Sequence, residues 1–105
     1  MTNKLLERID LRFTSIRMLE ANIRTMIARG PDESSSEAWW SWEATLGSLF
    51  GVARIRLLIA ERLIRTLPVG EERGAWDVFF ELHVLLISLD EDIVKVILAG
   101  EANGQ

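Results

Sequence analysis

The stretch from Glu37 to Leu67 constrains the fold most, because it is apolar around most of a helical circumference. Its inner residues recur at the three- and four-residue spacing of a helical packing seam: Leu46, Leu49, Ala53, Ala60, Leu63 and Leu67, flanked by Phe50, Leu57 and Ile64. Further apolar residues lie outside this seam, namely Val52, Ile55, Leu58 and Ile59. Such a helix needs partners on several sides, so we expect the central element of a bundle or of a subunit interface.

Residues 3–29 predict a long amphipathic helix, because one set of side chains keeps a heptad-like rhythm: Leu5, Ile9, Arg12, Ile16, Leu19, Ile23 and Met26. Gly30 and Pro31 end this helix, since glycine tolerates a left-handed closing residue and proline cannot continue the hydrogen-bond ladder. Ser34 and Glu37 have the spacing of a capping box for the next helix, and Ser35 is an equally plausible cap.

The second helix is expected over residues 35–67. Gly47 and Gly51 stand one turn apart within it, which indicates either a close approach of another backbone or a kink, and we favour a continuous helix. Residues 68–70 then end the second helix, and a third helix is expected over residues 71–99, with Gly100 as its stop. Its polar positions fall on one narrow stripe, which predicts that only this line meets water: Asp77, Glu81, Ser88, Glu91 and Lys95.

These patterns predict an all-α fold of three long antiparallel helices, a single domain over residues 1–105 that is completed as a bundle by dimerisation. Hydrophobic residues make up 49% of the chain, which is more apolar surface than a lone layer of three helices can cover. The chain has no cysteine, and the start carries charges where a secretion signal needs an apolar run, so we expect a cytoplasmic protein. Charged residues interrupt every long apolar stretch, which predicts that no membrane is a partner.

Charge is distributed unevenly along the chain. Residues 1–30 carry six basic and three acidic side chains, whereas residues 71–105 carry two basic and eight acidic ones. The pattern predicts that a basic first helix lies beside an acidic third helix, within or between subunits. Nucleic acid is not an expected partner, because the chain has a net charge of −4 and its arginines form no single basic stripe.

The residues for common catalytic chemistry are scarce. A single histidine, His83, excludes the paired Glu-x-x-His signature of di-iron bundles, and a metal site or a cofactor is not expected. The run Asp90, Glu91 and Asp92 is interpreted as solvated, because consecutive helical residues cannot converge on one ion. The sequence also has no glycine-rich phosphate loop and no nucleophile elbow. We therefore expect a protein that is not an enzyme.

Two arginines occupy positions where leucine is expected: Arg12 interrupts the seam of the first helix and Arg56 that of the second. One interpretation is a buried ion pair that fixes helical register, and several acids are candidate partners: Glu20, Glu43, Glu81 and Asp90. The alternative is a bundle pocket in which the arginines, with His83 nearby, bind an anion or serve a small dimeric all-α enzyme.

Three tryptophans, Trp39, Trp40 and Trp42, cluster in the first turns of the second helix. At about 100° per residue, Trp39 and Trp42 point to the same side, whereas Trp40 points away from them. We expect these rings to include a contact for another protein, because tryptophan is enriched among binding hot spots. The functional prediction is a homo-oligomer, a dimer in its simplest form, that binds and sequesters or inhibits another protein through an apolar helical surface.

Overall fold

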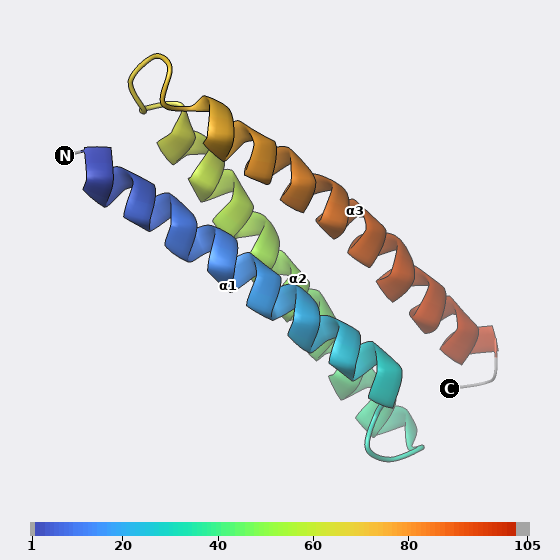
Figure 1. The fold of residues 1–105 in the computed structure, drawn as a ribbon. Coiled ribbons are helices and arrows are strands. Elements are labelled where there is room, and N and C mark those ends of the chain that lie inside the picture. The colour runs from blue at the N-terminus through green and yellow to red at the C-terminus, as the bar shows by residue number, and fades with distance from the viewer. Residues whose placement is uncertain (1, 103–105) are drawn as a thin grey trace.

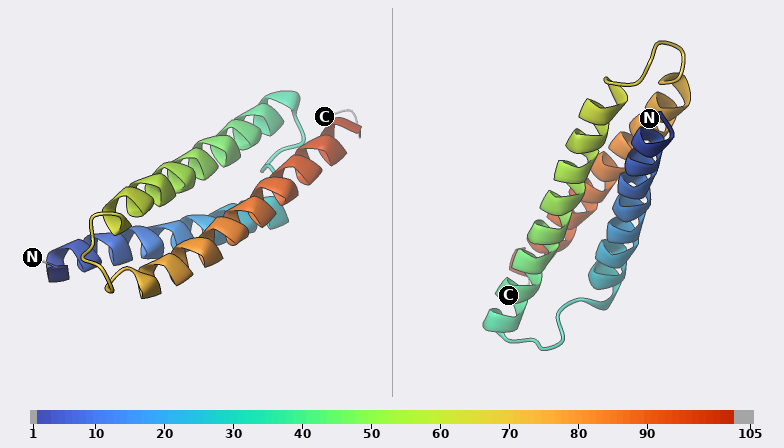
Figure 2. Two further views of the ribbon diagram at one scale, coloured as in Figure 1. Left: turned by 90° about the horizontal axis from the view of Figure 1, so that it is seen from above. Right: turned by 90° about the vertical axis from the view of Figure 1, so that its left-hand side faces the viewer.

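The computed structural model describes residues 2–102, which form three helices: α1 (Thr2–Arg29), α2 (Ser36–Ile64) and α3 (Arg73–Ala102). Consecutive helices run in opposite directions, and the molecule is a rod of 54 × 19 × 17 Å (Figure 1). The predicted all-α class and the three antiparallel helices are therefore confirmed. Figure 2 shows that each helix lies beside the other two, and no further element of the described chain covers the outer side of α2.

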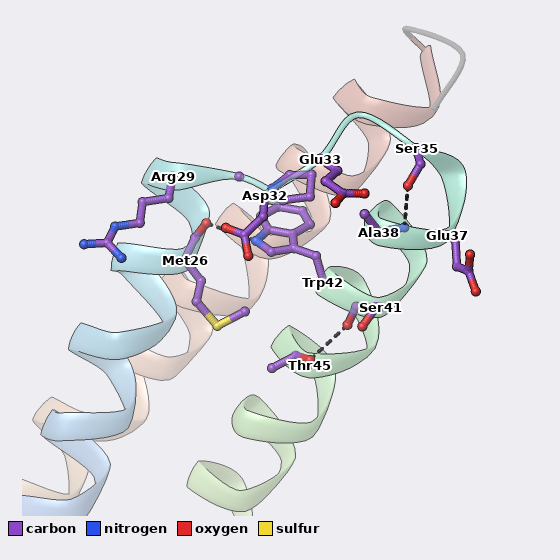
Figure 3. A pocket seen from close by; sticks show the side chains of 12 residues that line it. Met26, Arg29, Asp32, Glu33, Ser35, Glu37, Ala38, Ser41, Trp42 and Thr45 are labelled. Carbon is purple, nitrogen blue, oxygen red and sulfur yellow. Dashed lines mark hydrogen bonds between the residues drawn. The ribbon is translucent and has the colours of Figure 1, made fainter.

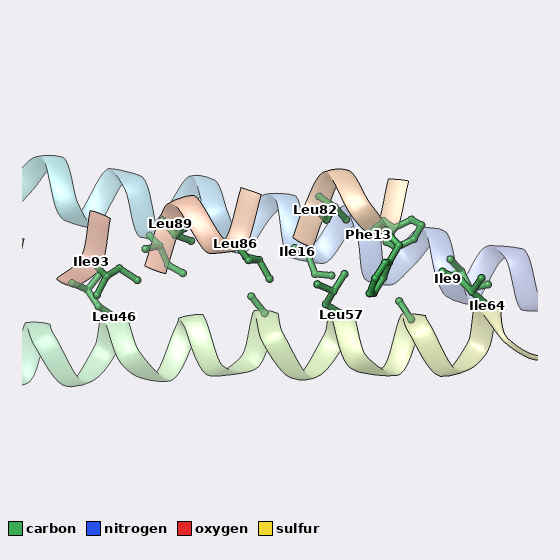
Figure 4. Packing of buried hydrophobic residues seen from close by; sticks show 14 of the residues in the cluster. Ile9, Phe13, Ile16, Leu46, Leu57, Ile64, Leu82, Leu86, Leu89 and Ile93 are labelled. Atoms are coloured by element: carbon green, nitrogen blue, oxygen red, sulfur yellow. The ribbon is translucent and has the colours of Figure 1, made fainter. Parts of the chain in front are cut away.

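A continuous apolar core lies between the three helices (Figure 4). In α1 the fully buried side chains are Ile9, Ile16 and Ile23, spaced seven residues apart as the heptad-like rhythm predicted. The other two helices contribute the same kind of residue at alternating three- and four-residue spacings, including Leu46, Ala53, Leu57, Ala60 and Ile64 of α2 and Phe79, Leu82, Leu86, Leu89 and Ile93 of α3.

The end of α1 and the start of α2 are joined by hydrogen bonds to one carbonyl group. Gly30 has a φ of 71°, and its backbone N–H donates to the Met26 carbonyl at 2.9 Å. The indole Nε1–H of Trp42 donates to the same carbonyl at 3.1 Å. A helix leaves its last carbonyls without internal partners, so these two donors fix the direction in which α2 leaves α1.

The N-cap of α2 is Ser35, whose hydroxyl accepts a hydrogen bond from the Ala38 backbone N–H at 3.1 Å. Of the two predicted caps, Ser35 is therefore confirmed and the capping box of Ser34 and Glu37 is wrong, because α2 starts one residue later than that box requires. Gly47 and Gly51 lie inside a continuous helix, and a Cβ atom at either position would meet open space. Neither a kink nor a close backbone contact explains these two glycines within one chain.

The boundaries around the second loop differ from the prediction by a few residues. The backbone N–H groups of Thr66 and Leu67 bond to carbonyls three residues back, which tightens the end of α2 and stops the α-helix at Ile64. Gly70 has a φ of 96°, and its N–H donates to the Glu72 carboxylate at 2.8 Å. Glu72 therefore belongs to the loop, and α3 begins at Arg73.

Gly100 is a packing residue of α3, not its stop. The helix continues to Ala102, and Gly100 is buried under the ring of Trp39 from α2. A Cβ atom at this position would overlap that ring. The prediction of a helix end at Ala99 is wrong, because glycine here allows a close approach between two helices.

Ion pairs join α1 to α3 along one edge of the rod. Arg17 Nη2 lies 3.6 Å from Glu81 Oε2, and Arg24 Nη1 lies 2.8 Å from Asp92 Oδ2. The hydrogen bonds that Arg24 donates to the Asp92 carboxylate and then to the Glu20 carboxylate raise the pKa of Arg24 above its ordinary value. The basic first helix thus lies beside the acidic third helix within one chain, as the charge distribution predicted. No helix in the described part of the chain is both long and apolar enough to cross a bilayer.

Candidate interaction surfaces

Large apolar side chains are exposed along two faces that share α2. We call the first the α1–α2 face, and its exposed apolar residues are Leu11, Met18, Val52, Ile55 and Ile59. We call the second the α2–α3 face, and its exposed apolar residues are Leu58, Phe80, Ile87, Val94 and Leu98. The prediction that only a narrow polar stripe of the third helix meets water is wrong for the single chain, because four residues of this second face lie on α3.

The α2–α3 face contains a hollow of about 410 Å³ between the two helices. Leu58 and Ile87 line it from opposite helices, and both are at least half exposed. Arg54 from α2 and Asp90 from α3 line the same hollow, so this face carries both signs of charge. His83 also lines it and stacks on Phe79, with ring centroids 6.1 Å apart and planes 9° apart.

An aromatic group extends this face toward the start of α3. Trp76 packs edge-on against Phe79 at a centroid distance of 5.3 Å and stacks on Phe80 at 5.9 Å. The Arg65 guanidinium lies 5.6 Å from the Trp76 ring centroid, within reach of a cation–π interaction. Phe80 remains 58% exposed despite these contacts, so the group presents an aromatic edge to solvent.

The α1–α2 face contains a hollow of about 360 Å³ that brings Arg12 and Arg56 together from two helices. The Arg56 side chain donates to the Ser15 hydroxyl, and Arg12 Nη1 donates to the Arg8 carbonyl at 3.3 Å. The predicted burial of both arginines is wrong: Arg12 is half-buried, Arg56 is exposed, and no polar or charged residue of the described chain is buried. Neither arginine has a carboxylate partner among the described residues.

The other candidates for an ion-pair or anion site lie elsewhere. Glu20 pairs with Arg24, Glu43 lines a hollow beside Trp40, and His83 belongs to the α2–α3 face. Of the predicted candidates, the structure therefore brings Arg12 and Arg56 together in one hollow and His83 and Asp90 together in another. Ser15 also lines the arginine hollow, and no sequence pattern pointed to it, because a single hydroxyl on an amphipathic helix has no distinctive spacing.

The three tryptophans occupy three different environments, and Trp39 and Trp42 point to the same side as predicted. Trp42 is buried, and its ring centroid lies 5.0 Å from that of the half-buried Trp39. The Trp39 Nε1–H is buried and has no acceptor in the described part of the chain. Trp40 is 71% exposed, so it is the ring of this cluster that another protein can contact most fully.

A further hollow of about 590 Å³ lies where the first loop joins α1 and α2 (Figure 3). Trp42 lies between the last turn of α1 and the first turns of α2, with Asp32 and Glu33 beside it (Figure 3). The polar side chains that line this hollow are the acids Asp32, Glu33 and Glu37, the hydroxyls of Ser35, Ser41 and Thr45, and Arg29. The hollow follows from the loop's path and brings no catalytic combination together.

Within residues 2–102, no group of three or more histidine, cysteine or carboxylate side chains is arranged to hold a metal ion. The features that stand out are the two apolar faces, the exposed Trp40 and the Arg12–Arg56 hollow. No protein-family model, curated protein or solved structure matches this chain.

Proposed function

We propose that this chain is a non-enzymatic, homodimeric interaction protein of the cytoplasm that binds another protein through its apolar helical surface and sequesters or inhibits it. The observation that carries the proposal is the alignment of exposed apolar residues in two continuous faces on either side of α2. Monomeric proteins rarely expose contiguous apolar patches of this kind, and such patches mark interaction sites. A cysteine-free chain suits a reducing compartment.

The area of the molecule supports association. Its accessible surface is 7035 Å², whereas a compact monomer of 11.9 kDa exposes roughly 6,000 Å². The excess of roughly 1,000 Å² is similar to the area of about 800 Å² that each partner buries in a stable interface. Part of the excess comes from the rod shape, and a second copy along the rod removes that surface from water.

We assign self-association to the α2–α3 face. Leu58 and Ile87 supply apolar area at its centre, and Arg54 and Asp90 supply opposite charges beside them. A two-fold axis places the same face on itself, so a face with both charge signs can pair arginine with carboxylate across the axis. The α1–α2 hollow has only positive charges and would place arginine opposite arginine.

Trp40 is proposed to anchor the bound protein. It lies 18 residues before Leu58, which corresponds to about 27 Å along the helix and to the same angular position. The ring is therefore far from the centre of the self-association face, at the end of the rod. A hollow lined by Trp40, Ala44 and Glu101 offers a rim for the contact.

Affinity capture from the cells that naturally make the protein tests this function. Wild type, Trp40→Ala and the surface control Lys95→Ala are immobilised in parallel, and the eluates are compared by stoichiometry. We expect one protein in stoichiometric amount with wild type and Lys95→Ala, and at least tenfold less with Trp40→Ala, since hot-spot truncation costs about 2 kcal/mol or more. Equal recovery with all three variants, or no specific protein with wild type, would contradict the proposal.

A further inference from the structure

The α1–α2 face combines exposed apolar residues with positive charge around one hollow. Leu11 is 70% exposed and Ile55 is 58% exposed on either side of it. Arg12 and Arg56 supply the only charges among its lining residues, and Ser15 supplies a hydroxyl between them. The hollow is therefore suited to a ligand that is apolar over most of its surface and negatively charged at one edge.

The positive charge of this hollow is not neutralised within the described chain, although the chain is acidic overall. Two other arginines of α1, Arg17 and Arg24, each pair with a carboxylate of α3. Arg12 and Arg56 contact only the Arg8 carbonyl and the Ser15 hydroxyl. Arginine presents a planar fork of donors that matches a carboxylate, so these two guanidinium groups are available to an acid from outside the chain.

The spacing of the apolar residues along this face matches an incoming helix. Leu11 and Met18 on α1 are seven residues apart, and so are Val52 and Ile59 on α2. Seven residues correspond to two helical turns, about 10 Å, which is the interval at which an amphipathic helix repeats its anchor residues in a groove. The side chains that would receive those anchors already line the hollow at Leu11, Val52 and Ile59.

We propose that the α1–α2 face binds an acidic amphipathic helix of another protein, with its apolar side in the groove and its carboxylates on Arg12 and Arg56. This inference rests on the proposed function, that the chain binds a protein, and it specifies the chemistry of the bound segment. A second copy of this chain is disfavoured as the occupant of the α1–α2 face, because a two-fold axis would place the arginines of one copy opposite the arginines of the other. A head-to-tail contact that placed the acidic α3 of a second copy on this face would form a ring where its rotation closes and an open chain where it does not, and either would show as a raised sedimentation mass.

The test uses two synthetic amphipathic helical peptides that share one leucine stripe and differ only at the flanking positions, which are glutamate in one and lysine in the other. Binding to the full-length protein is measured by calorimetry at low and at raised salt. We expect the glutamate peptide to bind at least about tenfold more tightly than the lysine peptide, and we expect raised salt to reduce this preference.

The charge-reversal variant Arg12→Glu with Arg56→Glu is expected to invert the preference, so that the lysine peptide binds more tightly. Both side chains reach solvent, and helical content by circular dichroism checks that this variant folds. The matched control is Arg73→Glu with Lys95→Glu, which makes the same charge change at two exposed positions of α3 that line neither hollow, and it is expected to keep the glutamate preference. Sedimentation of each variant reports its oligomeric state independently.

Three results would overturn the inference. Equal binding of the two peptides, or binding of neither, would show that the face does not select an acidic helix. Displacement of the glutamate peptide by succinate at an equal carboxylate concentration would assign the arginines to a free dicarboxylate. A changed sedimentation mass of the Arg12→Glu, Arg56→Glu variant would assign the face to a second copy. The proposed function fails separately, through the capture experiment with Trp40→Ala.

Discussion

At Gly100 a hydrogen atom takes the place of a side chain because the Trp39 ring occupies the space that a Cβ would need. This contact packs the last turn of α3 onto the first turns of α2 and buries a glycine within that last helical turn. Glycine in a helix is intrinsically unfavourable by roughly 0.5–1 kcal/mol relative to alanine. At position 100 this cost is offset because only glycine leaves room for the Trp39 ring.

Gly100→Ala is therefore expected to lower the free energy of unfolding by about 1–3 kcal/mol, through overpacking against Trp39. Gly47→Ala is the matched control, because a Cβ there meets open space in the helix. We expect this control to raise the free energy of unfolding by roughly 0.5–1 kcal/mol. Urea unfolding followed by circular dichroism measures both values, and opposite signs are the expected result. Two changes of the same sign would contradict the packing described at Gly100.

Trp40 is exposed and Trp42 is buried, so truncation of the two rings is expected to affect stability differently. Trp42→Ala is expected to cost about 3–5 kcal/mol of unfolding free energy, because it removes a buried ring that also donates to the Met26 carbonyl. Trp40→Ala is expected to leave the melting temperature and the oligomer unchanged, because the ring is 71% exposed. Thermal melts and sedimentation check both variants. Loss of the dimer in Trp40→Ala would assign this ring to self-association.

The arginines show where reasoning from spacing alone fails at this scale. Heptad position predicted burial, because every other member of the Arg12 row is apolar. The position lies at the edge of the packed arc, where a long side chain can cover apolar surface with its stem and keep its charge in water. Whether an edge position faces core or solvent depends on how the neighbouring helices pack, which spacing within one helix does not determine.

At the scale of elements, the N-cap of α2 is a single serine among three. Ser35 has an extended backbone and its hydroxyl binds the Ala38 N–H, whereas neighbouring Ser34 and Ser36 form no hydrogen bond of this kind in the described chain. Ser35→Ala is expected to lower the unfolding free energy by about 1 kcal/mol, and Ser34→Ala by a few tenths at most. Urea unfolding of both variants checks the assignment. A larger loss of unfolding free energy for Ser34→Ala than for Ser35→Ala would contradict this assignment and would favour the capping box of Ser34 and Glu37.

Most of the fold could be predicted from periodicity and from the residues that break helices. The apolar spacing identified α1 and α2 with most of their buried residues, the polar stripe identified α3, and Gly30 and Gly70 marked both loops, where each has a positive φ. The boundaries were less predictable, because local bonds to Leu63 and Glu72 shorten α2 and delay α3. Gly100 misled the prediction because a helix stop and a close helix contact both favour glycine.

At the scale of the whole molecule, the helices form a rod that has more apolar surface than the core of a single chain buries. The Cα radius of gyration is 16.6 Å, whereas a compact chain of this length has about 13 Å. The excess of apolar residues was predictable from composition and from the circumference of α2 and α3. The sequence did not predict that one apolar face carries both charge signs and the other only positive charge. This division depends on which helices are neighbours in the fold.

The sedimentation mass of the purified protein at micromolar concentration tests most directly the claim that these apolar faces are built to be covered by protein. The account predicts a mass of at least twice 11.9 kDa for wild type and a shift toward the monomer for Ile87→Glu, with helical content unchanged. Ile87 is 50% exposed, so a charge there affects association more than folding. A monomeric mass for wild type, with the circular dichroism spectrum of a folded helical protein, would contradict the account.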